Sequence, residues 1–557
     1  MPRRATLISP AGGWRRLGIC LVAIAAGLAW PAAAAEPAAV ADKIEPGLAS
    51  ELAARGADAR VRVIYLLRDR GLPSGRGERG AGAGLGGLRR AVAAQQDGVV
   101  TRLRAGGQRV VYASSLTGVI VAEADAAGVA AAAADPEVQA VHRERVRRPR
   151  LKVSRVVTQA AEVQARGFAG AGVKVGIVEP GRIGAHVALP PGRRILCRPG
   201  VAFGVSDHKT EVAGVVQSTD PTNTGMAPNV TLIDGNGEDF RDAEMIAATD
   251  CVVARGAAVV NMSFGLDTDG AWDAFAEYVD RLVYATGVTV VVAVSNDCTQ
   301  RMGSPEIAYN DLSVGAFADR GTTALADDVQ ACDPAISPRF SAYRDPPSLH
   351  GDREQPDILA PGHLIRTTVT PFGFEEISGT SLAAPHVAGE VALLQDRAPF
   401  SLAHQAERVR AIVAASARHD VAGKPRLSDR DGAGAVRFAA ADAILRDDRS
   451  WWFTTAGGRA GFPRFESFRA EAGQTVRVAL AWAQKPGADH RTVATNLQLR
   501  VLDPDGRPVR QSSTRDNNLE LVAFVASRAG RYRIQVDNVR ASAGREHVGL
   551  AVSLTDR

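Results

Sequence analysis

Residues 376 to 389 read EISGTSLAAPHVAG, which places Ser381 between a glycine-led turn and an alanine-rich run. Gly379 permits a tight backbone turn before the serine. The small residues that follow can pack a helix closely against a sheet, and Pro385 falls in the first helical turn, where its missing N–H costs little. Ser381 is therefore either a helix cap or the nucleophile of a hydrolase.

Apolar runs alternate with helix-like stretches from about 155 to 446. The runs are VKVGIV (173–178), VTLID (230–234), AAVVNMSF (257–264), GVTVVVAV (287–294) and LSVGAF (312–317). Continuous apolar runs of this kind are typical of parallel strands that are buried on both faces. They predict an α/β domain with a doubly wound, mostly parallel sheet. Because active sites in such sheets lie beyond the carboxyl ends of the strands, polar residues that end these runs are candidates for chemistry.

A carboxylate, a histidine and a serine occupy such positions. Glu179 ends VKVGIV, His208 begins the helix-like run HKTEVAGVVQS, and Ser381 opens another helix. Taken singly, the glutamate is a solvated turn residue and the histidine a structural one. Together they are the three groups of nucleophilic hydrolysis, in which the imidazole accepts the serine proton and the carboxylate fixes the imidazole tautomer.

Several motifs resemble those of the subtilisin-like serine proteases, or subtilases. GTSLAAPHVAG (379–389) matches the serine motif of that family almost letter for letter, and HKTEVAG (208–214) matches the histidine motif with Lys209 and Glu211 as departures. Also similar are GMAPNVTL (225–232), VVNMSFG (259–265), PDILAPG (356–362) and the closing stretch 432–444. The resemblance covers about 155 to 446, and the family order of the triad is acid, histidine, serine.

The resemblance implies roles for these residues. Ser381 is the nucleophile, His208 the general base, and Glu179 stands where the family has aspartate. Asn296 is implied as the side-chain donor of the oxyanion hole, together with the Ser381 backbone N–H. The alternative for Asn296 is a residue that ends a strand by bonding a turn. His386 is interpreted as structural, and the role of His186 stays open.

Two segments are implied to border the substrate cleft, where an extended peptide pairs with exposed backbone. Their residues are Ser263, Phe264, Gly265, Ala293, Val294 and Ser295. Residues 303 to 306 should lie near the pocket floor. Glu306 either favours a basic substrate side chain or faces solvent, and the solvent-facing position is the expectation.

The first 35 residues predict a secretory signal peptide, because arginines precede an apolar run from 17 to 30 that is followed by small residues. We therefore expect a secreted protein, periplasmic or extracellular. No later segment has the ~18 apolar residues of a membrane span. The net charge is only +5, and the arginines are scattered, which argues against a nucleic-acid surface.

Residues 36–150 alternate strand and helix patterns in the order β-α-β-β-α-β, which predicts a small α+β ferredoxin-like module. The module resembles the inhibitory propeptide of subtilases. The basic stretch RERVRRPRLK (143–152) follows it, so we expect the module to inhibit the enzyme until cleavage within about 145 to 160. The glycine-rich stretch at 73–87 is expected to be a flexible insertion.

Residues 450–557 show spaced strand patterns with turns between them, which predict an all-β sandwich or jelly roll. Asp503, Asp505 and Asp516 are turn formers or calcium ligands. The sequence requires no cofactor, and calcium is the one candidate.

Four cysteines follow the signal segment, and an even number in an oxidising compartment favours disulfides. Three pairings are open. We prefer Cys298 with Cys332 and Cys197 with Cys251, because the first pair brackets one candidate loop region. Free buried thiols are the alternative.

The sequence as a whole predicts a secreted serine endopeptidase made as a proenzyme. Its segments would be a signal (1–35), an inhibitory module (36–150), a peptidase domain (151–446) and a β-sandwich (450–557). Protein or peptide substrates and the chain's own propeptide would be its partners. The alternative is a catalytically impaired subtilase fold that acts as a binding module.

Overall fold

The computed structural model describes residues 40–45, 47–56, 59–68, 81–115, 117–143, 150–419, 421, 427, 430–455, 458–485, 490–542 and 545–556. The expected signal segment, 1–35, and the basic residues 144–149 lie outside this part of the chain. By its contacts the chain forms two compact units, Met1–Arg147 and Arg148–Arg557. Among the described residues, no helix combines the length and apolarity that crossing a membrane requires.

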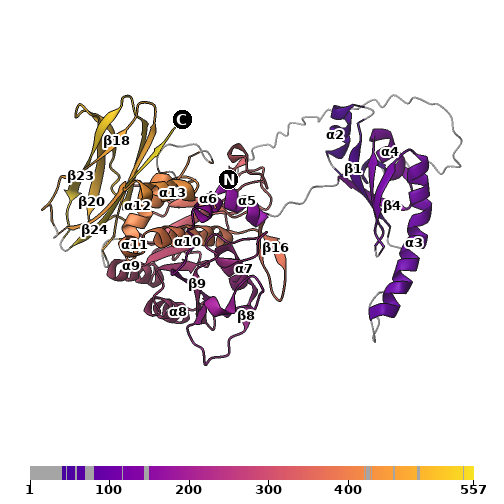
Figure 1. Ribbon diagram of the computed structural model, residues 1–557, viewed down its shortest axis with the longest axis horizontal. Coiled ribbons are helices and arrows are strands. Elements are labelled where there is room, and N and C mark those ends of the chain that lie inside the picture. The colour runs from indigo at the N-terminus through magenta and orange to yellow at the C-terminus, as the bar shows by residue number, and fades with distance from the viewer. Residues whose placement is uncertain are drawn as a thin grey trace, which may run out of the picture. The chain divides into compact units, whose positions relative to one another are not determined.

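The first unit is a four-stranded antiparallel sheet with helices, in the predicted β-α-β-β-α-β order (Figure 1). Its elements are α2 (Leu48–Arg55), β1 (Val61–Leu67), α3 (Ala81–Ala105), β2 (Arg109–Ala113), β3 (Val119–Ala124), α4 (Ala126–Ala134) and β4 (Val138–Arg143). The strands lie in the order β2-β3-β1-β4. Alternate residues of β1, Val63 and Tyr65, are buried against Val99 and Leu103 of α3, as the period of a half-buried strand requires.

The expectation of a flexible loop over 73–87 is wrong in its second half. Helix α3 begins at Ala81 and includes the glycine-rich stretch up to Gly87, while residues 73–80 lie outside the described part of the chain. Glycine is a poor helix former. Extending a helix that has already formed costs much less than starting one, however, and alanine and leucine alternate with these glycines.

The second unit contains an eight-stranded, mostly parallel sheet, as predicted. Its strands are β5 (Lys174–Pro180), β7 (Arg194–Leu196), β9 (Thr231–Gly237), β10 (Val259–Met262), β11 (Thr289–Ala293), β12 (Leu312–Ala318), β13 (Val329–Gln330) and β14 (Ile358–Pro361). They follow the order β13-β12-β11-β10-β5-β9-β7, with β14 beside β12. Only the β12–β13 pair is antiparallel.

Helices cover both faces of this sheet. On one face, α7 (Asp207–Gln217), α10 (Thr380–Arg397) and α12 (Ala406–Ser416) share a core with Val175 and Ile177 of β5. On the other face, α8 (Asp242–Ala254) and α9 (Ala274–Thr286) share a core with Val178 of the same strand. Neighbouring residues of β5 thus enter opposite cores, which explains why the strand reads as a continuous apolar run.

Smaller elements complete the peptidase region. They are α5 (Arg150–Val157), α6 (Ala160–Ala165), β6 (Arg182–Ile183), β8 (Val205–Ser206), β15 (Ile365–Thr368), β16 (Phe374–Ile377), α11 (Pro399–Leu402), α13 (Phe438–Arg446) and two single-turn 3-10 helices, Pro191–Arg193 and Leu325–Asp327. Helix α5 packs into the second unit, because Val153 and Val157 are buried with Phe317 and Leu359.

Two four-stranded antiparallel sheets follow, with the orders β17-β24-β19-β22 and β18-β23-β20-β21. Their strands are β17 (Ser450–Thr455), β18 (Arg464–Ala470), β19 (Thr475–Trp482), β20 (Asn496–Leu502), β21 (Pro508–Ser512), β22 (Leu519–Val525), β23 (Gly530–Arg540) and β24 (Glu546–Thr555). Side chains of both sheets share one apolar core, which includes Trp482 and Tyr532. The C-terminal region is therefore all-β and built of two packed sheets.

The first of these sheets also packs against the peptidase helices. In strand β19, Val478 packs in the core between the two sheets, whereas Ala479 and Ala481 pack in the core of the peptidase region. Figure 1 shows α12 and α13 between the β-strands and the α/β sheet. The Arg477 guanidinium is buried there and donates to the carbonyls of Ala414, Ala415 and Ala433.

Candidate active site

Glu179 and His208 meet at the carboxyl edge of the α/β sheet. Glu179 lies near the end of β5, and His208 is the second residue of α7, whose N-cap Ser206 accepts a hydrogen bond from the Lys209 N–H. His208 Nδ1 lies 2.8 Å from Glu179 Oε2. The carboxylate is only 1% exposed, whereas the imidazole is partly open to solvent. With Nδ1 donating to the carboxylate, Nε2 carries no proton and can accept one.

The charges around His208 favour its protonated form. Burial lowers the pKa of the imidazole, but the hydrogen bond to Glu179 and the negative charges of Glu179 and Glu211 outweigh burial and raise the pKa above its usual value of 6.5. Glu211 occupies the position of one of the two departures from the family's histidine motif. It therefore adds negative charge beside the imidazole.

Lys209, the other departure, supports the turn that follows Glu179. Its ammonium group is fully buried, lies 2.7 Å from Asp234 Oδ1, and donates to the carbonyls of Glu179, Gly181 and Gly235 at 3.0, 3.2 and 2.8 Å. Gly181 adopts a φ of 76°, a conformation that favours glycine. Asn236 also donates to the Gly181 carbonyl, at 2.7 Å. Lys209 and Asn236 thus fix the backbone around Glu179, a role that the sequence analysis did not predict for either side chain.

Ser381 and Asn296 lie together at the start of α10. The Asn296 amide oxygen accepts hydrogen bonds from the Thr380 N–H, at 2.9 Å, and from the Thr380 hydroxyl, at 3.0 Å. These bonds fix the orientation of the amide and leave Nδ2 without a partner among the described residues. A Cβ added to Gly379 would lie 3.0 Å from Ser381 Oγ and 3.8 Å from Asn296 Nδ2. The serine hydroxyl and the free amide N–H₂ therefore border the same small space.

One pocket contains all six residues predicted to border the substrate cleft. It is lined by Ser263, Phe264, Gly265, Leu266, Asp267, Ala293, Val294, Ser295, Asn296, Glu306, Thr380 and Ser381. Ser263 also supports the segment that carries Ser381, because its hydroxyl donates to the Ser381 carbonyl at 2.9 Å and accepts from the Asn261 side chain. His208 is not among the lining residues. Within the described part of the chain, His208 and Ser381 share no hydrogen bond.

The expectation that Glu306 faces solvent is wrong. Its side chain lines the pocket and is 1% exposed, and its carboxylate accepts a hydrogen bond from the Gly303 N–H at 2.9 Å. The Gln355 amide, 49 residues away in sequence, donates to the Glu306 backbone carbonyl. Local sequence could not show that this segment packs against so distant a part of the chain.

Two further histidines lie away from the triad residues. His386 is fully buried in α10, where Nδ1 donates to the Leu382 carbonyl at 2.7 Å and Nε2 accepts from the Ser154 hydroxyl at 3.0 Å. Burial lowers the pKa of His386 to about 4. His186 lies 2.8 Å from the Gly373 carbonyl and accepts from the Ala188 N–H. Both histidines join segments of the fold, as predicted for His386.

The three aspartates considered for calcium do not form a site. Asp503 accepts from the N–H groups of Asp505 and Arg507 in a turn, and Asp505 pairs with Arg528. Asp516 is buried and bonded to His350. In the part of the chain that the structure describes, no group of three or more His, Cys, Asp or Glu residues could hold a metal ion. Turn formation and ion pairing account for these aspartates.

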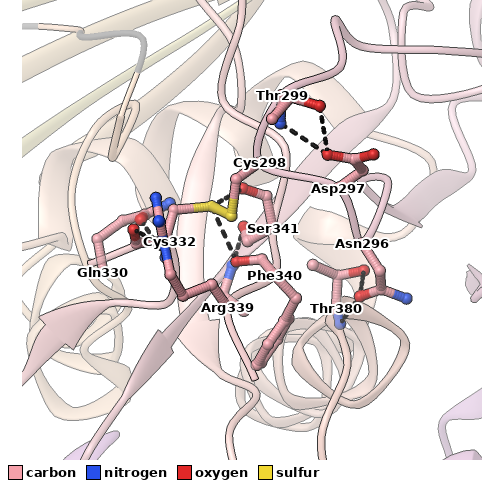
Figure 2. The surroundings of a disulfide bond; sticks show 11 residues. Asn296, Asp297, Cys298, Thr299, Gln330, Cys332, Arg339, Phe340, Ser341 and Thr380 are labelled. Atoms are coloured by element: carbon pink, nitrogen blue, oxygen red, sulfur yellow. Dashed lines mark hydrogen bonds between the residues drawn. A yellow bond between two sulfur atoms is a disulfide. The ribbon is translucent and has the colours of Figure 1, made fainter. Parts of the chain in front are cut away.

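Two disulfides join the preferred cysteine pairs, Cys197 with Cys251 and Cys298 with Cys332. Figure 2 shows that the second bond lies next to Asn296 in the chain, with Asp297 turned towards Thr299. Asp297 accepts from the Thr299 N–H at 2.8 Å and from its hydroxyl at 2.7 Å. The loop after Asn296 is therefore held by a covalent bond and a local turn.

Part of the chain is similar to known proteins. Residues 202–434 match the model of the subtilase family, Peptidase_S8. This part of the chain is similar to subtilisin-like serine proteases. Subtilisin DY of Bacillus licheniformis is 28% identical over 260 residues, which are 44% of this chain and 85% of that protein. Alkaline elastase YaB of Bacillus sp. (strain YaB) is 29% identical over 254 residues, 43% of this chain and 59% of that protein.

Among solved structures, the self-cleaved protease domain of PatA is 23% identical, with a TM-score of 0.40, over 50% of this chain and 98% of that one. The matched part of the chain is the domain of a serine endopeptidase. The matches to the Bacillus proteins cover less than half of the chain.

Proposed function

We propose that this subtilase is a secreted endopeptidase whose nucleophile is Ser381, with His208 as general base, Glu179 as the third triad member and Asn296 as oxyanion donor. The observation that carries the proposal is the 2.8 Å contact between His208 Nδ1 and the buried Glu179 carboxylate. A glutamate at this position has kept the contact that a triad acid must make. A fold that had become only a binding module would have no use for it.

In the proposed reaction, Ser381 Oγ attacks the carbonyl carbon of the scissile bond while its proton passes to His208 Nε2. The negative charge that develops on the carbonyl oxygen is stabilised by Asn296 Nδ2–H and the Ser381 N–H. The imidazolium, stabilised by Glu179, then protonates the departing amine, and the C–N bond breaks. Water repeats these steps on the acyl-enzyme and releases the acid product.

The missing hydrogen bond between His208 and Ser381 is compatible with this reaction. Catalytic hydrogen bonds are often long or poorly aligned in a substrate-free site and tighten when substrate binds. His208 has the freedom to adjust, since its side chain is 41% exposed while the carboxylate that holds it is buried.

We also propose that residues 36–150 inhibit the enzyme before it is processed. The expected cleavage range, 145–160, overlaps α5, in which Val153 and Val157 are buried and Ser154 bonds His386. A protease cannot reach a peptide bond inside a packed helix without unfolding it. We therefore expect self-cleavage on the N-terminal side of Val153.

A fluorophosphonate probe tests the proposal. We expect it to label the wild-type protein and to leave Ser381→Ala unlabelled and unable to hydrolyse peptides, with both proteins equally folded by circular dichroism. Mass spectrometry should find a shortened wild type and an unshortened Ser381→Ala chain. An unlabelled, uncleaved wild type would favour the binding-module alternative, and equal labelling of both proteins would place the nucleophile elsewhere.

A further inference from the structure

The inner part of the pocket beside Ser381 contains a buried carboxylate. Glu306 is 1% exposed, whereas Gly265, Leu266 and Asp267 on the same pocket are exposed and form its rim. Apart from Glu306 and Asp267, the lining residues are apolar or uncharged. The pocket therefore carries two carboxylates and no positively charged side chain of its own.

The Glu306 carboxylate has one satisfied oxygen and one that lacks a partner. Oε1 accepts from the Gly303 N–H, but Oε2 has no hydrogen-bond partner among the described residues. Oε2 faces Gly265, since a Cβ on that glycine would lie 2.9 Å away. Residue 265 therefore carries no side chain that would displace this oxygen.

Leaving a carboxylate oxygen buried without a donor is unfavourable, and a charged donor from a ligand would remove that cost. Burial raises the pKa of Glu306 to about 7, although backbone N–H groups of Gly303, Glu306 and Ser295 oppose this increase; the negative charge of Asp267 adds slightly to it. A cation in the pocket would favour the ionised carboxylate and form a charge-assisted hydrogen bond in a place closed to water. Arginine and lysine carry such donors at the end of a long apolar stem.

We propose that this subtilase cleaves after basic residues, and that the Glu306 carboxylate binds the guanidinium or ammonium group of the residue whose carbonyl is attacked. The assignment rests on the proposed function, because it uses Ser381 and Asn296 to locate that carbonyl. Both residues line the same pocket as Glu306. The side chain next to the attacked carbonyl is therefore the one that enters it.

Paired substrates test the charge directly. Fluorogenic peptides that differ only in having arginine or citrulline before the scissile bond have nearly the same shape, and only arginine is charged. We expect wild-type kcat/KM to favour arginine by at least about tenfold, a ratio typical of hydrogen bonds to charged groups. In Glu306→Gln, which keeps the acceptor for Gly303, the ratio should fall towards one.

Asp297→Asn is the matched control. It removes the same charge close to Asn296, but Asp297 does not line the pocket and bonds Thr299 instead. The arginine preference should persist in this variant. Equal cleavage of both peptides by the wild type, or an equal loss of preference in Asp297→Asn and Glu306→Gln, would overturn the assignment. A preference for citrulline would show instead that Glu306 acts as a neutral donor.

A binding measurement keeps the test independent of catalysis. Benzamidine and neutral benzamide are titrated calorimetrically into Ser381→Ala and into Ser381→Ala with Glu306→Gln. We expect benzamidine to bind the first protein at least about tenfold more tightly than benzamide, and the second protein without that preference. Loss of fluorophosphonate labelling in the wild type together with retained benzamidine selectivity would refute the proposed function alone. Fluorophosphonate labelling of the wild type without benzamidine selectivity would refute only the proposed preference for basic residues.

Discussion

Lys209 Nζ lies 2.7 Å from Asp234 Oδ1, and neither side chain has any exposed surface. The lysine comes from the first turn of α7, and the aspartate from β9, the strand beside the one that carries Glu179. Because the same ammonium group also bonds the Glu179 and Gly181 carbonyls, the ion pair fixes the backbone on both sides of the turn that follows the acid. It thereby supports a longer acid than the family's aspartate.

Removing Lys209 should be costly. Lys209→Met removes the ion-pair partner of the buried Asp234, so we expect a loss of roughly 3–5 kcal/mol in the free energy of unfolding. Lys174→Met is the control, since Lys174 lies on β5 and donates to the Arg255 carbonyl near the surface. Urea unfolding in the Ser381→Ala background, which prevents autolysis, measures both. Equal stabilities of the two variants would contradict the role of the ion pair.

The triad acid can be tested by conservative changes. Glu179→Gln keeps the size of the side chain but can no longer hold the imidazole in the tautomer with Nδ1 protonated, so kcat should fall by up to about 10⁴-fold. Glu179→Asp keeps the charge on a shorter side chain and should retain part of the activity. Steady-state kinetics with one peptide substrate compare the two. Wild-type turnover in Glu179→Gln would show that Glu179 is not the triad acid.

The acid limb of the pH–rate profile should lie above the pH expected of an ordinary histidine. Activity requires neutral His208, and the pKa of His208 is raised by Glu179 and Glu211 against the effect of burial. Activity should therefore fall as the pH drops through a midpoint above 6.5. Glu211→Gln removes one of the negative charges and should shift the midpoint of kcat/KM to lower pH. A flat profile from pH 5 to 8 would exclude His208 as the base.

Glu390, a buried carboxylate in helix α10, should make the free energy of unfolding depend on pH. Burial raises the pKa of Glu390 to about 8, and neither carboxylate oxygen has a hydrogen-bond partner among the described residues. The folded state therefore holds a proton that the unfolded chain releases above about pH 4.5. Binding of this proton contributes to the free energy of unfolding. The contribution is fully present below pH 4.5 and is lost as the pH rises towards 8.

Glu390→Gln should accordingly gain stability relative to the parent as the pH rises from 5 to 9, by up to about 4 kcal/mol. Urea unfolding at several pH values in the Ser381→Ala background measures this difference. Glu238→Gln supplies the control, because it removes a carboxylate that is exposed rather than buried. A difference between Glu390→Gln and its parent that stays constant with pH would contradict the raised pKa.

Much of the fold could be predicted because its strands are buried in characteristic ways. Parallel strands such as β5 lie between two cores and read as continuous apolar runs, and the strands of the C-terminal sheets are separated by turns. Ser381, His208 and Asn296 were predicted from motifs in which small residues surround one polar group, and their roles stay predictions.

The environments of Lys209 and Glu306 could not be predicted in the same way. Each side chain is buried among segments distant in sequence: Lys209 contacts Asp234 and Gly235, and the Glu306 carboxylate faces Gly265. A charged residue on a helix or in a loop is usually exposed. The one available signal for Lys209 was Asp234, a carboxylate that closes the apolar run VTLID.

The joint between the peptidase region and the C-terminal sheets determines how the second unit moves in solution. Alanines of β19 pack beneath the helices, Arg477 caps three carbonyls there, and a Cβ at Gly549 of β24 would lie 2.3 Å from the Glu407 carbonyl oxygen of α12. Surfaces this close leave no room for a hinge. Residues from 150 to the C-terminus should therefore tumble with one rotational correlation time. A molecule bound by the sheets would then keep a fixed distance and orientation relative to Ser381.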